Sequence, residues 1–409
     1  MSSRSFLRTA AAGASVLLLV GCKDAGTPAP AAADAGAKAG AAPAADLKAV
    51  ATKMVAAAMV KAGDRVLITG SARDNALMEN LAIETMKNGG QPLIAIGSDD
   101  LMRRAYEEVP ASYDSQKPTL GLALADAFDV QLTVEVGEAE NLLAGVPAAR
   151  LAARAKAAVP VSEAFIKRGI RGVDLGNGLY PTAALAGHLG KPLSEVSAVF
   201  WKAVNVPPEV IRTKGEGLRA ALQAGKKVEL TSANGTSITF ATSAKDGFVS
   251  DGAITAERVK QGRGAPNTWL PAGELLVPVT PGTAEGKVVI DKLVFQGAMI
   301  EGLTLSFTKG RLTTMTATSG IDPLRALYDA SGSNKELFSY IDLGLNPEAK
   351  LPTNTGRIIY MVPGGVTIGM GDNTGWGGSN VSDFGLAGAI TAATLKIDGK
   401  AIIENGVPK

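Results

Sequence analysis

The stretch from Val366 to Gly385, VTIGMGDNTGWGGSNVSDFG, places several side chains capable of chemistry between apolar segments. Asp372, Asn373 and Asp383 supply oxygen atoms that can bind a cation or a polar ligand, and Trp376 supplies an aromatic face. The glycines among them permit tight turns. No histidine occurs here, although zinc sites commonly use imidazole as a ligand. The stretch therefore predicts a hollow that binds a substrate or a cation through oxygen atoms.

Other catalytic patterns are weaker. His188 is the one histidine of the chain, and it precedes Gly190 at a predicted helix end, where helix capping explains it better than catalysis or metal ligation. The S-x-x-K pattern from Ser306 to Lys309 falls in a predicted strand, where residues three apart point to opposite faces. GMGDNTG, residues 369–375, has no helix after it, so a tight turn is favoured over a phosphate loop.

Helices and strands alternate in the first half of the chain. Apolar runs predict strands at Arg65 to Gly70, Gln91 to Gly97 and Val130 to Gly137, and amphipathic runs predict helices between them. Gly70 lies in a strand-to-helix turn, because GSARDN lacks the other glycines of a dinucleotide-binding loop. Such alternation predicts an α/β N-terminal domain with a parallel sheet over residues 46–220.

The second half, residues 221–409, has short alternating runs and many turn residues. Val228 to Thr231 and Ser237 to Ala241 flank Asn234-Gly235, a strong hairpin signal. We expect helices at Pro323 to Ala330 and around Lys335 to Tyr340, before the strands that carry the opening stretch. This half is predicted to be a β-rich α+β C-terminal domain that carries the site.

The N-terminus resembles a bacterial lipoprotein signal. Residues 1–21 contain Arg4 and Arg8, a short apolar run and Leu19-Val20-Gly21 before Cys22, the one cysteine of the chain. The run is too short to span a bilayer. We expect lipidation at Cys22 after cleavage, so that the lipid holds the protein to the bacterial cell envelope on the extracytoplasmic side. The Ala, Pro and Gly residues of 22–45 predict a disordered tether.

The charge of the chain disfavours nucleic acid as a partner. The chain has 41 basic and 39 acidic residues, and removal of Arg4 and Arg8 with the signal peptide leaves 39 of each. Nucleic-acid-binding proteins carry a basic surface instead.

The order of several motifs resembles the metallo-aminopeptidase family typified by aminopeptidases T and S. The resemblance spans nearly all of residues 46–403. Its motifs are GDRVLITG, YPTAALAGHLGKPLSEVSAVFWKAVNV, LRAALQAGKKVELTSANGTSITF, NTWLPAGELLVPV, EGLTLSFTKGRL, IDLGLNPEA, TIGMGDN and SNVSDF. The resemblance implies an α/β domain, a β-rich domain with the site, two bound divalent metals, usually zinc or cobalt, and often a homodimer.

Transfer of the family's site to this chain leaves gaps. The first glutamate ligand falls on Glu274, and the second falls on or near Tyr340, with Asp342 as the closest acid. One family histidine falls on Thr367. The final histidine is absent from Val381-Ser382-Asp383-Phe384, although its aspartate, Asp383, is present. The remnant metal ligands implied are therefore Glu274, Asp342 and Asp383, with Thr367, Asp372, Asn373 and Trp376 lining the same hollow.

These losses change the expected chemistry. Zinc and cobalt favour sites with imidazole, whereas carboxylates alone suit a weakly held cation such as calcium or magnesium. A related branch of this fold opens a dihydroxypyridine ring with ferrous iron, and it also needs the missing histidines. We expect a degenerate member that binds a peptide or small amine, or assembles with a partner, without hydrolysis. The alternative is an active aminopeptidase that holds a divalent cation through carboxylates.

Overall fold

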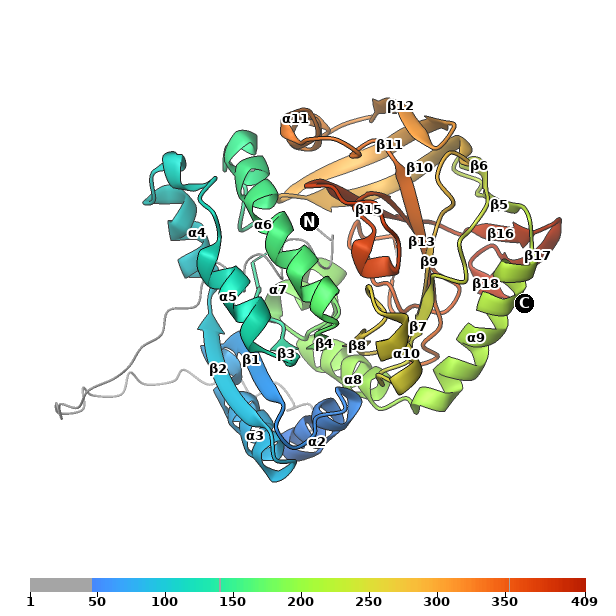
Figure 1. Ribbon diagram of the computed structural model, residues 1–409. Coiled ribbons are helices and arrows are strands. Elements are labelled where there is room, and N and C mark those ends of the chain that lie inside the picture. Colours follow the sequence, from blue (N-terminus) through green and yellow to red (C-terminus); the bar gives the residue numbers. More distant parts are fainter. Residues whose placement is uncertain (1–45, 140, 353) are drawn as a thin grey trace.

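The computed structural model describes residues 46–409 except residues 140 and 353 (Figure 1). The predicted signal peptide, Cys22 and the predicted tether lie outside the described residues. Within the described part, no helix combines the length and the apolar character that a membrane span requires.

A five-stranded parallel sheet forms the centre of the first half (Figure 1). In spatial order its strands are β2 (Gln91–Gly97), β1 (Arg65–Ser71), β3 (Val130–Val134), β4 (Arg171–Leu175) and β8 (Asn267–Leu270). The strands predicted at residues 65, 91 and 130 are therefore confirmed. Their apolar side chains, Val66, Ile68, Val130 and Leu132 among them, are fully buried, because helices cover parallel sheets.

Helices connect and cover these strands. They are α2 (Leu47–Ala57), η1 (Ala72–Asp74), α3 (Asn75–Lys87), α4 (Asp99–Glu107), η2 (Ala111–Tyr113), α5 (Thr119–Ala127), α6 (Ala148–Arg168), α7 (Ala183–Leu189) and α8 (Leu193–Val204). The sequence defines several of their ends. Asp46 caps α2 by accepting from the N–H groups of Lys48 and Ala49, and Gly169 ends α6 in the left-handed conformation.

The second half contains two antiparallel sheets, drawn in yellow to red in Figure 1. The larger has the order β12 (Arg311–Thr316), β11 (Ala298–Thr308), β10 (Glu285–Phe295), β6 (Ser237–Phe240), β5 (Val228–Thr231), β16 (Thr394–Ile397), β17 (Lys400–Glu404) and β18 (Val407–Pro408). The smaller has the order β15 (Gly385–Ile390), β14 (Val366–Gly371), β13 (Phe338–Gly344), β9 (Glu274–Pro278) and β7 (Phe248–Ser250).

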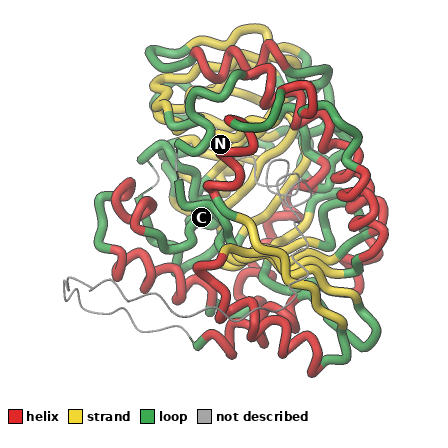
Figure 2. Tube along the Cα trace, turned by 90° about the vertical axis from the view of Figure 1, so that its left-hand side faces the viewer, coloured by secondary structure: helices red, strands yellow, loops and turns green. Residues whose placement is uncertain are grey.

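Few helices accompany these sheets. They are α9 (Pro208–Ala224), α10 (Ala256–Gln261), α11 (Asp322–Ala330) and η3 (Thr374–Trp376). Figure 2 shows the strands of the two halves as separate groups with most helices outside them. The predicted α/β N-terminal domain and β-rich C-terminal domain are thus confirmed.

The predicted helix around Lys335 to Tyr340 is wrong, because β13 begins at Phe338. All seven residues of β13 are buried, and the strand lies between β14 and β9. Because β13 forms hydrogen bonds with a strand on each side, the aromatic and β-branched residues of FSYIDLG are stable in a strand. This pairing outweighs the local sequence pattern that favours a helix.

β8 connects the two predicted domains. It follows residue 220 in the chain, but it pairs in parallel with β4 of the first sheet. The domain boundary at residue 220 stays a prediction. The parallel sheet contains strands from both sides of that position in the sequence.

The two faces of the smaller antiparallel sheet belong to different clusters. Side chains such as Leu275, Ile341 and Ile368 point into the main hydrophobic core. The opposite face contributes Leu276, Tyr340 and Ala387 to a separate cluster, together with Trp269 of β8 and with Ile358 and Tyr360 of an irregular segment. This second face, here called the site face, therefore lies between the smaller sheet and the edge of the parallel sheet.

Candidate functional site

Strand register brings three of the predicted residues to the site face. Asp342 on β13 pairs with Thr367 on β14 and with Leu276 on β9. Glu274 lies two residues from Leu276 on the same strand, so it points to the same face. Directly paired residues have Cβ atoms roughly 5 Å apart and diagonal neighbours roughly 7–8 Å. Glu274, Asp342 and Thr367, all buried, therefore form one group.

The segment before Glu274 links the two sheets. β8 ends at Leu270, and β9 begins four residues later at Glu274. Gly273 has a φ of 126° and lies so close to Asn346 that a Cβ there would be 2.6 Å from the Asn346 side chain. The Asn346 Nδ2 atom donates to the carbonyl of Ala272 at 2.6 Å. Glu274 is thus held by a closely packed backbone.

Asn177 contacts Glu274 directly. It follows β4 in the turn Gly176-Asn177-Gly178 and adopts a φ of 52°. Its Nδ2 donates to Oε1 of Glu274 and to the carbonyl of Pro271, both at 2.8 Å. The Oδ1 atom of Asn177 is buried and has no hydrogen-bond partner among the described residues. Such an atom favours a ligand that brings a donor.

Glu135 is a further buried acid, which sequence analysis missed. It follows β3, and its Oε2 accepts from the N–H of Gly178 at 3.2 Å. A Cβ at Gly176 would lie 2.5 Å or less from atoms of the Glu135 side chain. Glu135 and Asn177 both follow carboxyl ends of parallel strands, where ligands of α/β folds bind. The predicted strand runs to Gly137 and no strand is predicted before Asn177, so this position at the strand ends is visible in the structure and not in the sequence.

An aromatic pair lies on the same face. The rings of Tyr340 and Trp376 stack with centroids 4.3 Å apart and planes 15° apart. Tyr340 is two residues before Asp342 on β13, and Gly369 opposite it leaves room for the ring, because a Cβ there would overlap the ring atoms. The indole Nε1 of Trp376 is buried without a hydrogen-bond partner among the described residues.

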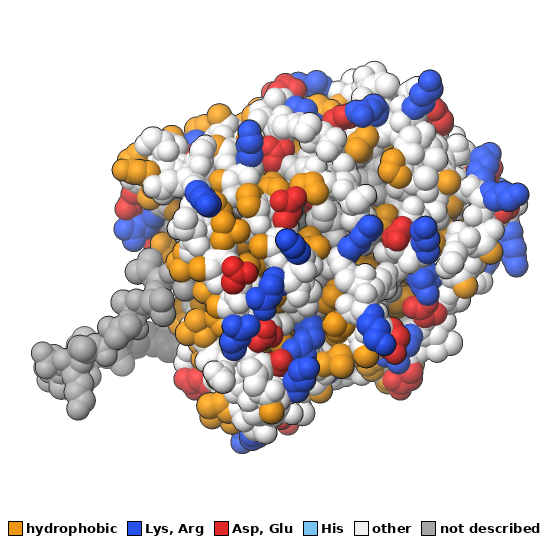
Figure 3. All heavy atoms as spheres, viewed as in Figure 1, with side chains coloured by type: hydrophobic (Ala, Val, Ile, Leu, Met, Phe, Trp, Pro, Cys, Tyr) orange, Lys and Arg blue, Asp and Glu red, His pale blue; other side chains and the backbone are white. Residues whose placement is uncertain are grey.

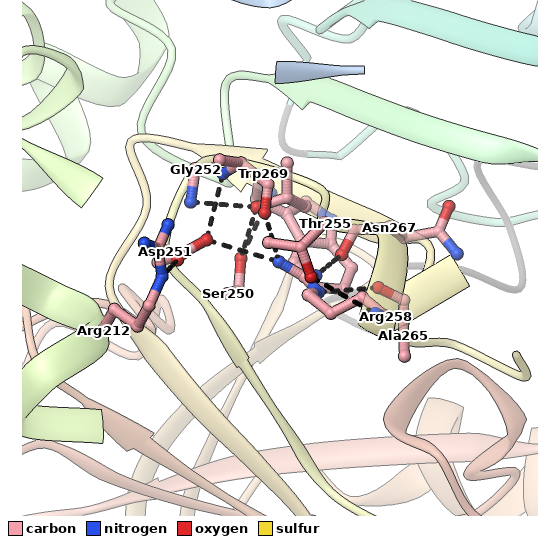
Figure 4. Close-up of polar contacts among 11 residues, drawn as sticks. Arg212, Ser250, Asp251, Gly252, Thr255, Arg258, Ala265, Asn267 and Trp269 are labelled. Atoms are coloured by element: carbon pink, nitrogen blue, oxygen red, sulfur yellow. Dashed lines mark hydrogen bonds and ion pairs between the residues drawn. The ribbon is translucent and has the colours of Figure 1, made fainter. Parts of the chain in front are cut away.

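A charged network supports the strands beside Glu274 (Figure 4). Ser250 of β7 pairs with Glu274, and the next residue, Asp251, accepts from Arg212 at 2.6 Å and from Arg258 at 3.4 Å. Arg258 also donates to the backbone carbonyls of Ala253, Ala265 and Asn267. Burial lowers the pKa of Arg258 to about 10, and Asp251 opposes this change. The network fastens α10 to β7 and β8.

Comparison with known proteins now identifies the family. A family model described as thermophilic metalloprotease (M29) matches residues 45–337, more than half of the chain. The chain belongs to the M29 family. This confirms the resemblance predicted from the sequence motifs.

Two solved structures show the same fold. Wild-type AmpT from Thermus thermophilus has a TM-score of 0.66 at 18% identity, with 88% of this chain and 98% of that chain covered. A 2,5-dihydroxypyridine dioxygenase from Pseudomonas putida has a TM-score of 0.53 at 15% identity, with 89% of this chain and 96% of that chain covered. At these identities the likeness concerns the fold alone. No curated protein gives a significant sequence match.

Other predicted site residues of this M29 member lie at the far end of β14. Asp372 accepts from the hydroxyl of Thr374 at 3.0 and 3.1 Å. Asn373 donates from Nδ2 to the carbonyl of Ser339 and accepts from the N–H of Asn380, so it closes the turn. Asp372 follows Thr367 by five residues, roughly 16 Å at the rise of a strand. Neither residue joins Glu274 and Asp342.

Burial also changes the ionisation of Asp372. It raises the pKa of the Asp372 carboxyl to about 7, and the hydrogen bonds from Thr374 and Ser382 oppose that change. Asp372 is therefore a buried acid that titrates near neutral pH, in a turn rather than on the site face.

Asp383 also lies apart from the other predicted ligands. Both of its carboxylate oxygens accept from the N–H of Gly332, at 2.9 and 3.1 Å, just beyond the end of α11. Asp383 precedes β15, whose Ala389 is the residue that pairs with Thr367. Asp383 thus lies six residues before the partner of Thr367 and does not reach Glu274 and Asp342, so the three predicted ligands do not converge.

His188 lies at the end of α7, as expected for a capping position, and Gly190 follows in the left-handed conformation. Its Nε2 forms a hydrogen bond of 2.9 Å with the carbonyl oxygen of Thr355. This contact fixes an irregular segment, residues 354–361, that passes over the site face.

The residues present do not fit the two-metal site that the family implies. In the described part of the chain, no group of three or more His, Cys, Asp or Glu side chains is arranged to hold a metal ion. Glu274 and Asp342 provide oxygen alone, Thr367 carries a hydroxyl where the resemblance implies an imidazole, and Asn177 donates to Glu274, which would have to bind the metal. Such a donor set is a poor one for zinc or cobalt.

Proposed function

We propose that this M29 member is a lipid-anchored binding protein that recognises the amino group of a peptide or small amine and does not hydrolyse peptides. The observation that carries the proposal is the arrangement around Asn177. Its unpaired Oδ1 lies beside Glu274, on the face that also holds Asp342. An ammonium group has three N–H donors and a positive charge, which match an amide oxygen and two carboxylates.

The aromatic pair supports the same ligand class. Alkylammonium groups bind favourably to the faces of aromatic rings. Tyr340 and Trp376 stack beside Asp342, and the indole N–H of Trp376 requires an acceptor. The carbonyl oxygen of the first peptide residue, two bonds from the α-carbon that carries the amine, would supply that acceptor.

The absence of imidazole from the site supports the loss of hydrolysis. In metallopeptidases, bound metal lowers the pKa of a water molecule so that it attacks the peptide bond. Carboxylates alone hold such a metal weakly. The alternative, an active aminopeptidase, draws its support from Glu274, a buried acid on which the family resemblance places the first glutamate ligand.

The proposal includes a place in the cell. A lipid on Cys22 would hold the protein to the extracytoplasmic side of the envelope, with residues 22–45 as the tether. A homodimer is proposed on the family resemblance. Nucleic acid is not proposed as a partner, since Lys and Arg side chains alternate with Asp and Glu over the face in Figure 3.

One experiment separates the two functions. Purified lipoprotein in detergent is titrated with leucinamide and with N-acetyl-leucinamide, which lacks the free amine. We expect heat of binding with leucinamide alone, and its loss in Glu274→Gln. In parallel, hydrolysis of leucine p-nitroanilide is measured with added zinc, cobalt or manganese. Metal-dependent hydrolysis that disappears in Glu274→Gln would establish the aminopeptidase instead.

A further inference from the structure

The irregular segment of residues 354–361 belongs to the connection from β13 to β14, and it packs against the site face. Two hydrogen bonds hold the start of the segment. One joins Nε2 of His188 to the carbonyl oxygen of Thr355, and in the other the N–H of Val294 donates to the carbonyl oxygen of Gly356 at 2.9 Å. The end of the segment is fixed by Asn346, whose N–H donates to Met361 at 2.9 Å. Arg357 lies between these anchors.

The neighbours of Arg357 pack against the residues that surround the acids. Ile358 and Tyr360 belong to the same cluster as Leu276 and Tyr340. The carbonyl oxygen of Ile358 would lie 3.6 Å from a Cβ at Gly178, next to Asn177. The carbonyl oxygen of Tyr360 would lie 2.7 Å from a Cβ at Gly344, which pairs with Glu274.

Ile358, the residue after Arg357, therefore approaches the turn of Asn177 and Gly178. In that turn Asn177 donates to Glu274 and Gly178 donates to Glu135. Arg357 is half-buried, and it carries a long side chain with five N–H donors. Glu274 and Asp342 are almost fully buried. A buried carboxylate is stable only when a cation or several hydrogen bonds compensate for its lost hydration.

We propose that the guanidinium of Arg357 is the resident cation of the site face and pairs with the carboxylates of Glu274 and Asp342, in the role that a metal ion has in a hydrolytic site. A guanidinium stays charged at all relevant pH values and forms a planar fork that matches carboxylates. The site therefore keeps its buried acids without any need for metal.

The inference deepens the proposed function. Only its statement about the ammonium ligand rests on that function; the pairing of Arg357 with the carboxylates does not. The ammonium group of a ligand must compete with Arg357 for the same carboxylates. Removal of the guanidinium should therefore increase the affinity for amines, and it should also let the acids take up a metal ion.

The experiment uses the purified lipoprotein and its Arg357→Ala variant, with melting temperature and metal content as readouts. For the wild type, we expect no change in melting temperature with manganese, zinc or a chelator. We expect Arg357→Ala to melt roughly 5 °C lower or more, as for the loss of a buried charge partner in a domain of this size. Millimolar manganese or zinc should restore part of the loss, and the Kd for leucinamide should fall roughly tenfold, or about 1.4 kcal/mol.

Two further variants distinguish the loss of the ion pair from a general folding defect. Arg357→Lys keeps the charge and should retain most of the melting temperature. The double variant Arg357→Ala, Glu274→Gln removes both charges and should melt higher than Arg357→Ala alone. Arg325→Ala, a change in an arginine on α11, serves as the control and should gain no metal response.

The inference is overturned if Arg357→Ala melts like the wild type. It is also overturned if the variant melts lower but responds neither to metal nor to Glu274→Gln. Failure of the proposed function looks different. In that case the wild type and Arg357→Ala would both ignore leucinamide, while the metal response of Arg357→Ala would still support the resident cation.

Discussion

Nδ2 of Asn177 donates a hydrogen bond of 2.8 Å to Oε1 of Glu274, across 97 positions of sequence. The bond joins the carboxyl end of β4 in the parallel sheet to the first residue of β9 in the antiparallel sheet. Oδ1 of the same amide stays buried and has no hydrogen-bond partner in the described part of the chain. One side chain thus orients the acid and offers an acceptor to a ligand.

Replacement of Asn177 by glycine should weaken both binding and stability. Glycine adopts the φ of 52° without strain. The change in stability and in affinity therefore measures the contribution of the Asn177 side chain. Loss of a hydrogen bond to a charged group costs about 1.5–3 kcal/mol. We expect that loss in urea unfolding and an affinity for leucinamide reduced roughly tenfold, while Asn177→Ala adds about 1–2 kcal/mol of backbone strain. Unchanged leucinamide affinity in Asn177→Gly would remove Asn177 from the site.

Replacement of Thr367 by histidine should create a metal ligand. Thr367 pairs with Asp342 on the site face, so an imidazole there would point toward the carboxylates. We expect zinc to remain, after dialysis, in the double variant Thr367→His, Arg357→Ala, in which no guanidinium competes for the carboxylates, and not in the wild type, as measured by elemental mass spectrometry. Thr394→His in the larger sheet, combined with the same Arg357→Ala change, is the matched control. Equal zinc in both histidine variants would indicate surface binding.

Asp372 should make stability depend on pH. Burial raises its pKa in the folded chain to about 7 from a usual value of 3.8. Between these values the folded state keeps a proton that the unfolded state has lost. The stability that the neutral carboxyl contributes is therefore complete below about pH 4 and is lost as the pH rises to about 7.

The test is Asp372→Asn, which stays neutral and keeps an oxygen acceptor for Thr374. Each pKa unit corresponds to about 1.4 kcal/mol, so relative to the wild type the variant should gain stability on the order of a few kcal/mol between pH 4 and pH 8. Unfolding in urea across this pH range measures the gain. Parallel curves for the two proteins would show that Asp372 does not titrate as described.

Arg258 should be essential for stability. Its removal would leave Asp251 buried with Arg212 as its remaining ion-pair partner, and the loss of one member of a buried pair costs about 3–5 kcal/mol. We expect the free energy of unfolding of Arg258→Met, measured in urea, to be lower than that of the wild type by that amount. Arg258→Met combined with Asp251→Asn should recover part of it. Arg104→Ala on the exposed surface of α4 should change stability by less than about 1 kcal/mol.

Sequence patterns predicted the local elements well. The hairpin around Asn234-Gly235 gave β5 and β6 nearly to the residue, because the turn chemistry and the alternation both lie within a few positions. β8 and β13 were harder. β8 has four residues, and its partner β4 lies far back in the chain, so nothing local indicates the pairing.

The candidate site divides in the same way. Glu274, Asp342 and Thr367 came from the family resemblance, and the strand register groups them. The spacing of Asp372, Asn373 and Asp383 favours a shared hollow, but Asp372 and Asn373 accept hydrogen bonds within their own turn. Asp383 accepts instead from the N–H of Gly332, beyond the end of α11. Glu135 and Asn177 were missed because their proximity to Glu274 depends on the order of strands in the sheet. Arg357 lies in an irregular segment with no pattern at all.

The pairing of β8 with β4 also determines when the parallel sheet can be completed during synthesis. A chain emerges from the ribosome from its N-terminus, and β4 is complete at Leu175, but its edge stays open until Leu270 appears. Until then the nascent parallel sheet offers a free strand edge to any other chain. A fragment that ends at residue 220 keeps that edge permanently, so it should aggregate rather than serve as a separate module.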